Sequence, residues 1–154
     1  MTVPTDNAVG IAVRDLFRTN LTDPLGRASN NSWIHYGDIQ KHAKTPQVFV
    51  QPARGMRKFR RLGSGRQDKT LFFNCVVIVR ISPMISTDLN EILDDVVNEM
   101  ENTVEDNWSS LTGVWEMKVD NISGVFPVPD RKEYNNVVTI ACIIENEGTR
   151  QSIY

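Results

Sequence analysis

One segment of the chain, residues 69–81, limits the fold more than any other. Its sequence, KTLFFNCVVIVRI, is a nearly continuous run of β-branched and aromatic residues. Such a run is typical of a strand that is buried on both faces, because a strand with one solvated face alternates apolar and polar residues. We therefore expect a strand at the centre of a sheet.

Two amphipathic helices are predicted to accompany this strand. Apolar residues recur at helical spacing over residues 5–20, where Thr5 or Asp6 can cap the first turn. A longer helix is predicted to begin near Thr87 or Asp88. Its apolar stripe comprises Leu89, Ile92, Leu93, Val96, Val97, Met100, Val104 and Trp108. Shorter strands are predicted at residues 33–36, 47–51, 114–128 and 136–145.

The order of these elements predicts a single α+β domain over residues 1–147. We expect a mostly antiparallel, mixed sheet with the two helices packed on one face. A chain of 154 residues is long enough to bury such a core without metal or disulfide support. A long basic β-hairpin excursion is predicted between the strands at 47–51 and 69–81, with its tip near Gly63–Gly65. Residues 148–154 are expected to form a flexible C-terminal tail.

Charge is divided between two neighbouring segments, although the net charge is only −2. Residues 54–69 contain the basic set Arg54, Arg57, Lys58, Arg60, Arg61, Arg66 and Lys69. Residues 88–106 contain no Lys or Arg, and their candidate acidic counter-surface is Glu91, Asp94, Asp95, Glu99 and Glu101. On different faces of one domain, each set is the natural partner of the other on a neighbouring copy. Contact between unlike surfaces builds rings or filaments rather than closed two-fold dimers.

Other interpretations of both charged segments remain open at this stage. Charge runs are commonly solvated surface, whether on a helix face or on a loop. Exposed ion pairs contribute about 0–1 kcal/mol each, so they select the register of a contact more than they supply its affinity. Apolar residues would have to supply the affinity. The candidate anchors are Trp33, Ile34 and Tyr36, in the long stretch that follows the first helix.

The sequence shows no pattern that is typical of an enzyme or a metal site. His35 and His42 are seven residues apart and match no zinc spacing. The Gly63–Gly65 segment lacks the Lys-Ser/Thr of a phosphate loop. Cys75 and Cys142 lie in β-branched runs, which favours buried, reduced thiols. We therefore expect no catalysis, no cofactor and no metal. With no apolar run of about 20 residues and no signal peptide pattern, we expect no membrane association and a cytoplasmic site of assembly.

Taken together, these elements resemble the tail terminator, or tail completion, proteins of long-tailed phages and related viruses. The resemblance rests on the first helix, TPQVFVQP, RGMRKFRRLGSGRQ, TLFFNCVVIVRI, STDLNEILDDVVNEMENTV, VWEMKVDNIS and NVVTIACIIE, in that order. It covers residues 5–147 as a likeness of element order and size.

The resemblance implies a structural virion protein of the tail and neck region. Such a protein forms a ring, expected to be a hexamer, that caps the tail tube protein and presents a surface to the head-neck connector protein. Viral DNA passes through the lumen and contacts it transiently. The resemblance carries over no catalytic residue, and it leaves open whether the basic hairpin faces the lumen, the tube or a neighbouring subunit.

Two alternatives accompany this interpretation. A head-tail neck completion role would use the same physics. Alternatively, residues 54–69 could clamp nucleic acid phosphates without reading base sequence, because several guanidinium groups release counterions from a duplex. Their single aromatic residue, Phe59, argues against a stacking mode of single-strand binding.

Overall fold

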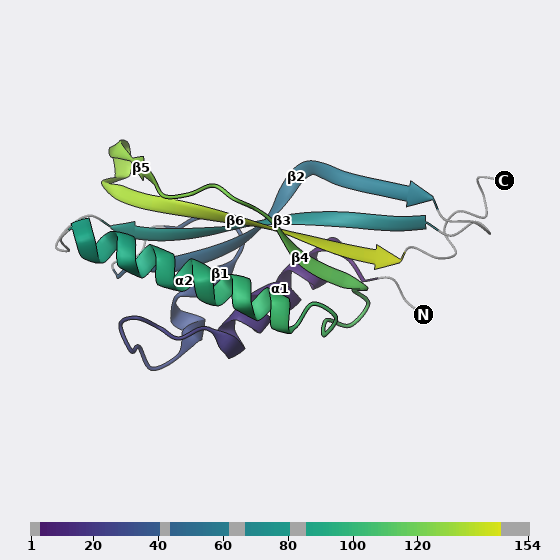
Figure 1. Ribbon diagram of the computed structural model, residues 1–154, viewed down its shortest axis with the longest axis horizontal. Coiled ribbons are helices and arrows are strands. Elements are labelled where there is room, and N and C mark those ends of the chain that lie inside the picture. Colours follow the sequence, from purple (N-terminus) through teal and green to yellow (C-terminus); the bar gives the residue numbers. More distant parts are fainter. Residues whose placement is uncertain (1–3, 41–43, 62–66, 81–85, 146–154) are drawn as a thin grey trace.

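The computed structural model describes residues 4–40, 44–61, 67–80 and 86–145. Within it, the side chains of residues 54–61, 67, 86–89, 131 and 145 are not described. These residues form a two-layer domain, with a long twisted sheet on one side and two α-helices on the other (Figure 1). The predicted α+β class is thereby confirmed. The predicted hairpin tip at Gly63–Gly65 and the C-terminal tail at 148–154 lie outside the described residues.

The sheet of the described residues contains six strands in a mixed arrangement. They are β1 (Ile34–Tyr36), β2 (Gln47–Arg61), β3 (Gln67–Arg80), β4 (Glu116–Ile122), β5 (Phe126–Val128) and β6 (Glu133–Glu145). The strand order is β1-β2-β3-β6-β4, and β5 pairs with the start of β6. Strand β1 runs parallel to β2, whereas the other neighbouring pairs are antiparallel.

The predicted central strand is β3, which lies between β2 and β6. Its odd-numbered residues from Leu71 to Val79 are buried in the large core on the helix side. On the opposite face, Phe72, Val76 and Ile78 are also buried. Both faces of β3 therefore exclude water, which explains why its sequence does not alternate between apolar and polar residues.

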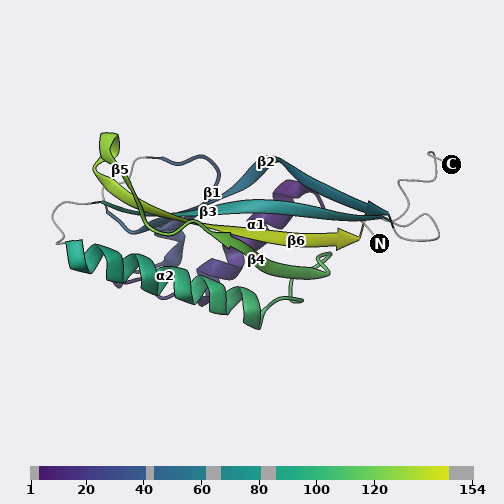
Figure 2. The same ribbon diagram turned by 45° about the horizontal axis from the view of Figure 1, so that its top comes forward.

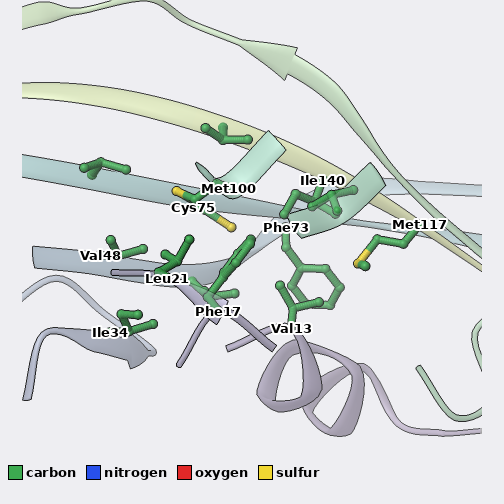
Figure 3. Packing of buried hydrophobic residues seen from close by; sticks show 14 of the residues in the cluster. Val13, Phe17, Leu21, Ile34, Val48, Phe73, Cys75, Met100, Met117 and Ile140 are labelled. Carbon is green, nitrogen blue, oxygen red and sulfur yellow. The ribbon is translucent and has the colours of Figure 1, made fainter. Parts of the chain in front are cut away.

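Both helices cover the same face of the sheet, as predicted. Helix α1 (Asp6–Asn20) packs beside β1 and β2, and α2 (Ser86–Asp106) packs across β3, β6 and β4 (Figures 1 and 2). The Oγ1 atom of Thr5 accepts a hydrogen bond from the Ala8 amide at 3.1 Å, so Thr5 is the cap of α1. Apolar residues of both helices meet the sheet in one continuous core (Figure 3).

Helix α1 approaches the sheet closely at Gly10. A Cβ atom at this position would collide with the Tyr36 ring and would lie 2.9 Å from Cε1 of Phe73. Glycine is a poor helix former in general. Its presence in the middle of α1 is explained by this close approach, which leaves no room for a side chain.

The long basic β-hairpin excursion predicted between the strands at 47–51 and 69–81 is confirmed as far as the described residues reach, because β2 and β3 stay paired out to Arg61 and Gln67. Other strands differ from the predictions in their extents. Strand β6 begins at Glu133 rather than at residue 136, and the strand predicted at 114–128 is divided into β4 and β5. Gly124, with φ +80°, lies in the break between them.

Candidate assembly surfaces

The basic residues of β2 lie on a distinct part of the sheet, which we call the basic arm: residues 54–61 of β2. Among the described residues, β1 pairs with β2 at Val48–Val50, and beyond this point β2 is paired on its β3 side. The arm follows a bulge, because Pro52 pairs with Phe73 and Arg57 pairs with Leu71. Strand β2 bends at this bulge (Figure 1). The arm therefore forms part of one lateral edge of the sheet.

The seven predicted basic residues do not form one group in the structure. Five lie in the arm: Arg54, Arg57, Lys58, Arg60 and Arg61. Arg66 is outside the described residues. Lys69 lies in β3 opposite Phe59, and its Nζ atom is 3.4 Å from Oδ1 of Asp6. Because the Lys69 side chain is largely buried and reaches α1, it belongs to the fold more than to an external surface.

The acidic residues predicted as a counter-surface lie on the outer side of α2. Glu91, Asp94 and Asp95 are exposed, and Glu99 and Glu101 are partly exposed. The opposite side of the helix is buried, as Leu93 and Met100 illustrate. Glu99 also has an internal role, because its Oε2 atom accepts a hydrogen bond from the Thr22 amide at 2.8 Å. The acidic surface extends to Glu105 and Asp106, which end the helix and are exposed.

The two charged surfaces lie on different parts of the domain: the basic arm belongs to one edge of the sheet, whereas the acidic residues lie on the outer side of α2, which covers one face over β3, β6 and β4. The basic arm belongs to β2, whereas α2 leads directly into β4. Strands β3 and β6 separate β2 from β4 in the sheet, so the two edges are about 14 Å apart at about 4.8 Å per strand. Both ribbon views place β2 and β4 at opposite margins (Figures 1 and 2). Two unlike charged surfaces at separate places on one subunit are compatible with a head-to-tail contact between copies.

The predicted apolar anchors do not lie on the surface, and this expectation is corrected. Trp33 and Ile34 are fully buried in the core. Tyr36 is partly buried beside them and donates a hydrogen bond to Oδ1 of Asn7 at 2.9 Å. Their segment folds inward because β1 pairs with β2 beneath α1. Trp33 and Ile34 are therefore unavailable to a neighbouring subunit.

Two other tryptophans are exposed, although the sequence did not lead us to predict them as surface residues. Trp108 and Trp115 have exposed fractions of 54% and 53%. Spacing alone placed Trp108 on the apolar stripe of α2, but the helix ends at Asp106, so Trp108 does not continue the stripe. The run Asn107-Trp108-Ser109-Ser110, which is polar apart from the tryptophan, was the available signal that the helix stops there.

The described residues contain no grouping that suggests catalysis. No cluster of three or more His, Cys, Asp or Glu side chains among them could hold a metal ion. The Nε2 atom of His35 lies 2.8 Å from Oε1 of Gln47, which is an ordinary structural contact, and His42 is outside the described residues. Neither described helix combines the length and apolar character needed to cross a bilayer.

Both cysteines are free and buried, as expected. They lie in neighbouring strands, but Cys75 pairs with Val138 and Cys142 pairs with Leu71, so they are four residue pairs apart. Burial raises the pKa of Cys142 to about 12 and raises the pKa of Cys75 further. Neither thiol has the ionised, nucleophilic character of a reactive cysteine at neutral pH.

No protein-family model matches this chain, and no curated protein matches it either. Its function is therefore inferred from its own surfaces and from the order of its sequence elements.

Proposed function

We propose that this chain is a structural subunit that assembles head to tail into a ring, and that the ring terminates the tail tube of a virus. The observation that carries the proposal is the position of the two charged surfaces. A basic strand forms part of one edge of the sheet, and an acidic helix leads into the opposite edge. A subunit with two unlike, complementary sides adds to its neighbours in one direction, and a suitable rotation between them closes a ring.

The charges guide this contact rather than provide most of its stability. Each exposed ion pair contributes about 0–1 kcal/mol, and like charges oppose wrong alignments. Salt screens such pairs, since the Debye length falls from about 10 Å at 0.1 M to about 3 Å at 1 M. Assembly should therefore weaken as ionic strength rises, while contacts between apolar groups persist.

The viral role rests on the resemblance of the chain to tail terminator proteins. In this role a ring, expected to have six subunits, caps the tail tube protein and joins it to the head-neck connector protein. DNA passes through the lumen, and the ring resides in the virion after assembly in the host cytoplasm. A head-tail neck completion role requires the same self-assembly, and reconstitution with purified tail tubes separates the two roles.

Charge reversal tests the self-assembly on which the proposal depends. Changing Arg57, Lys58, Arg60 and Arg61 to Glu should abolish the oligomer, measured as mass by light scattering. Reversing Asp94, Asp95 and Glu101 to Lys in the same chain should restore part of it, because the contact is then rebuilt with opposite sign. A doubly reversed chain that assembles no better than either singly reversed chain contradicts the pairing of these surfaces.

A second candidate function is favoured by the separation of the charged surfaces. The carboxylates of α2 would repel DNA bound beside them, but they lie on the outer side of a helix that covers β3, β6 and β4, whereas the basic arm belongs to β2. An arm used as a phosphate clamp would bind duplexes of any sequence, with an affinity whose logarithm falls linearly with the logarithm of the salt concentration. In that case the variant with Arg60 and Arg61 changed to Glu would lose duplex binding, while the mass of the protein would stay unchanged.

A further inference from the structure

The connection between α2 and β4 carries two large aromatic side chains that are more than half exposed. We call Trp108 and Trp115 the tryptophan platform. The Met117 amide donates a hydrogen bond to the Trp108 carbonyl at 2.8 Å, and the Trp115 amide donates to the Ile143 carbonyl at 2.7 Å. Both backbones are thus fixed to the edge of the sheet. Tryptophans so placed are typical of the central anchors of protein interfaces.

The surroundings of the platform are acidic. Glu105 and Asp106 precede Trp108, and Glu116 follows Trp115; all three are exposed. The last turn of α2 contains no basic residue, and the negative end of the helix dipole lies there. Lys118 is the single Lys or Arg between residues 88 and 130.

An aromatic surface within a negative field selects a particular kind of partner. A guanidinium group stacks on an indole face and also pairs with carboxylates, so arginine-rich segments satisfy both features at once. Nucleic acid does not fit this surface, because its phosphates cannot pair with carboxylates and would be repelled by Glu105, Asp106 and Glu116. The platform therefore favours a cationic protein segment.

We propose that the platform binds the basic arm of a second copy of this chain. The arm carries five of the basic residues, in a strand at the edge of the sheet opposite to the platform. The inference rests on the self-assembly proposed above and identifies its apolar anchors, which replace Trp33, Ile34 and Tyr36.

Removal of the indole rings of both tryptophans tests the platform. The variant with Trp108→Ala and Trp115→Ala should keep the fold, measured by circular dichroism. Its midpoint concentration for assembly, measured by light scattering, should rise at least about tenfold, the effect expected of central aromatic anchors. The matched control changes Val125 and Phe126 to Ala. These residues are also exposed but lie at β5, so assembly of the control should be unchanged.

A mixing experiment then identifies the occupant. The double tryptophan variant retains an intact arm, and the variant with Arg57, Lys58, Arg60 and Arg61 changed to Glu retains an intact platform. At a protein concentration below the midpoint of either variant, each should be monomeric alone, and an equimolar mixture should give a one-to-one heterodimer, because one complete contact remains. A mixture that stays monomeric contradicts the pairing of arm and platform.

The outcomes separate this inference from the proposed function. Assembly that is unaffected by loss of both tryptophans overturns the platform alone and leaves the ring in place. An unmodified chain that is monomeric under all conditions overturns both the platform contact and the self-assembling ring.

Discussion

The connections at residues 21–33 and 107–115 both carry tryptophan, yet they place it in opposite environments. In the first, Trp33 is fully buried, and its Nε1 atom donates a hydrogen bond to Oδ1 of Asn30 at 2.9 Å. The guanidinium of Arg27 lies over the ring at 5.4 Å from its centre. In the second connection, Ser110 bonds back to Asn107, and Trp108 and Trp115 stay exposed.

The difference lies in the polar residues that surround each tryptophan. Arg27 ties the first connection to the chain just before β2, because it donates to Asp23 at 2.6 Å and to the Pro46 carbonyl at 2.8 Å. Asn30 donates to the carbonyls of Arg18 and Leu21, which ties the segment to the end of α1. A tryptophan is buried where such bonds satisfy most of the polar atoms beside it. The first connection therefore serves stability, and the second is available to a partner.

The largest effect is expected from Trp33→Ala. Removal of a fully buried indole should lower the free energy of unfolding by about 3–5 kcal/mol, because the core cannot close the cavity completely. Urea denaturation followed by circular dichroism measures this loss. The same change at Trp115 is the control, and an equally small loss at both positions would remove the distinction between the two connections.

A smaller loss is expected from Asp23→Asn, which weakens the charged contact with Arg27. The side chain of Asp23 is 4% exposed, and its hydrogen bonds with a charged partner should contribute about 1.5–3 kcal/mol. Burial alone would raise the pKa of Asp23, but hydrogen bonds from the Arg27 side chain and from the Leu25 and Arg27 amides hold it below its usual value.

The pH dependence of this contribution has a definite sign. Because the folded pKa of Asp23 is lowered, its stabilising effect is complete above the unfolded value of about 3.9 and is lost as pH falls through the folded pKa. The stability difference between the unmodified chain and Asp23→Asn should therefore be constant from pH 7 to about pH 5 and shrink below about pH 4. A difference that is equal at pH 7 and pH 3 would show that Asp23 does not act through its charge.

Gly10→Ala tests how tightly α1 is held against Tyr36, at the end of the inward-folded segment. In an exposed helix this change would stabilise by about 1 kcal/mol. Here the added methyl group should destabilise by about 1–3 kcal/mol, since it collides with the Tyr36 ring. Ala8→Gly, at an exposed position of α1, measures the propensity effect separately. A gain in stability from Gly10→Ala would indicate that Tyr36 and its segment move aside at little energetic cost.

The smallest effect on stability is expected at the platform. Trp108→Ala and Trp115→Ala should each change the free energy of unfolding by about 1 kcal/mol or less, because both rings are more than half exposed. Urea denaturation under conditions where the protein is monomeric measures this change. A loss comparable to that of Trp33→Ala would assign these residues to the core instead of to a contact surface.

Much of the fold could be predicted because its elements have strong local patterns. The run at 69–81 and the apolar stripes of α1 and α2 each favour one structure without help from distant residues. The basic half of β2 could be predicted only as one side of a hairpin, from the glycines near its tip and the strong strand that follows. The bulge between Pro52 and Arg57 could not be predicted, because it depends on the register with β3, a tertiary contact that the composition of β2 does not indicate.

The candidate surfaces could be predicted only in part. The charge blocks are visible in the sequence, but the placement of the basic arm at a sheet edge and of the acidic helix over β3, β6 and β4 follows from the tertiary fold. Exposure of a tryptophan depends on whether its connection folds inward, as at Trp33, or outward, as at Trp108. That choice is made by hydrogen bonds such as those of Arg27 and Asn30, which join residues far apart in the sequence.

The most direct test of the account is the mass of the unmodified chain in solution, measured by light scattering over a series of protein and salt concentrations. Head-to-tail assembly through unlike charged surfaces predicts a discrete oligomer with a mass near six times that of the chain, which dissociates as salt rises from about 0.1 M to 1 M. A monomer at every protein and salt concentration would contradict self-assembly, and with it the role of the basic arm and the platform.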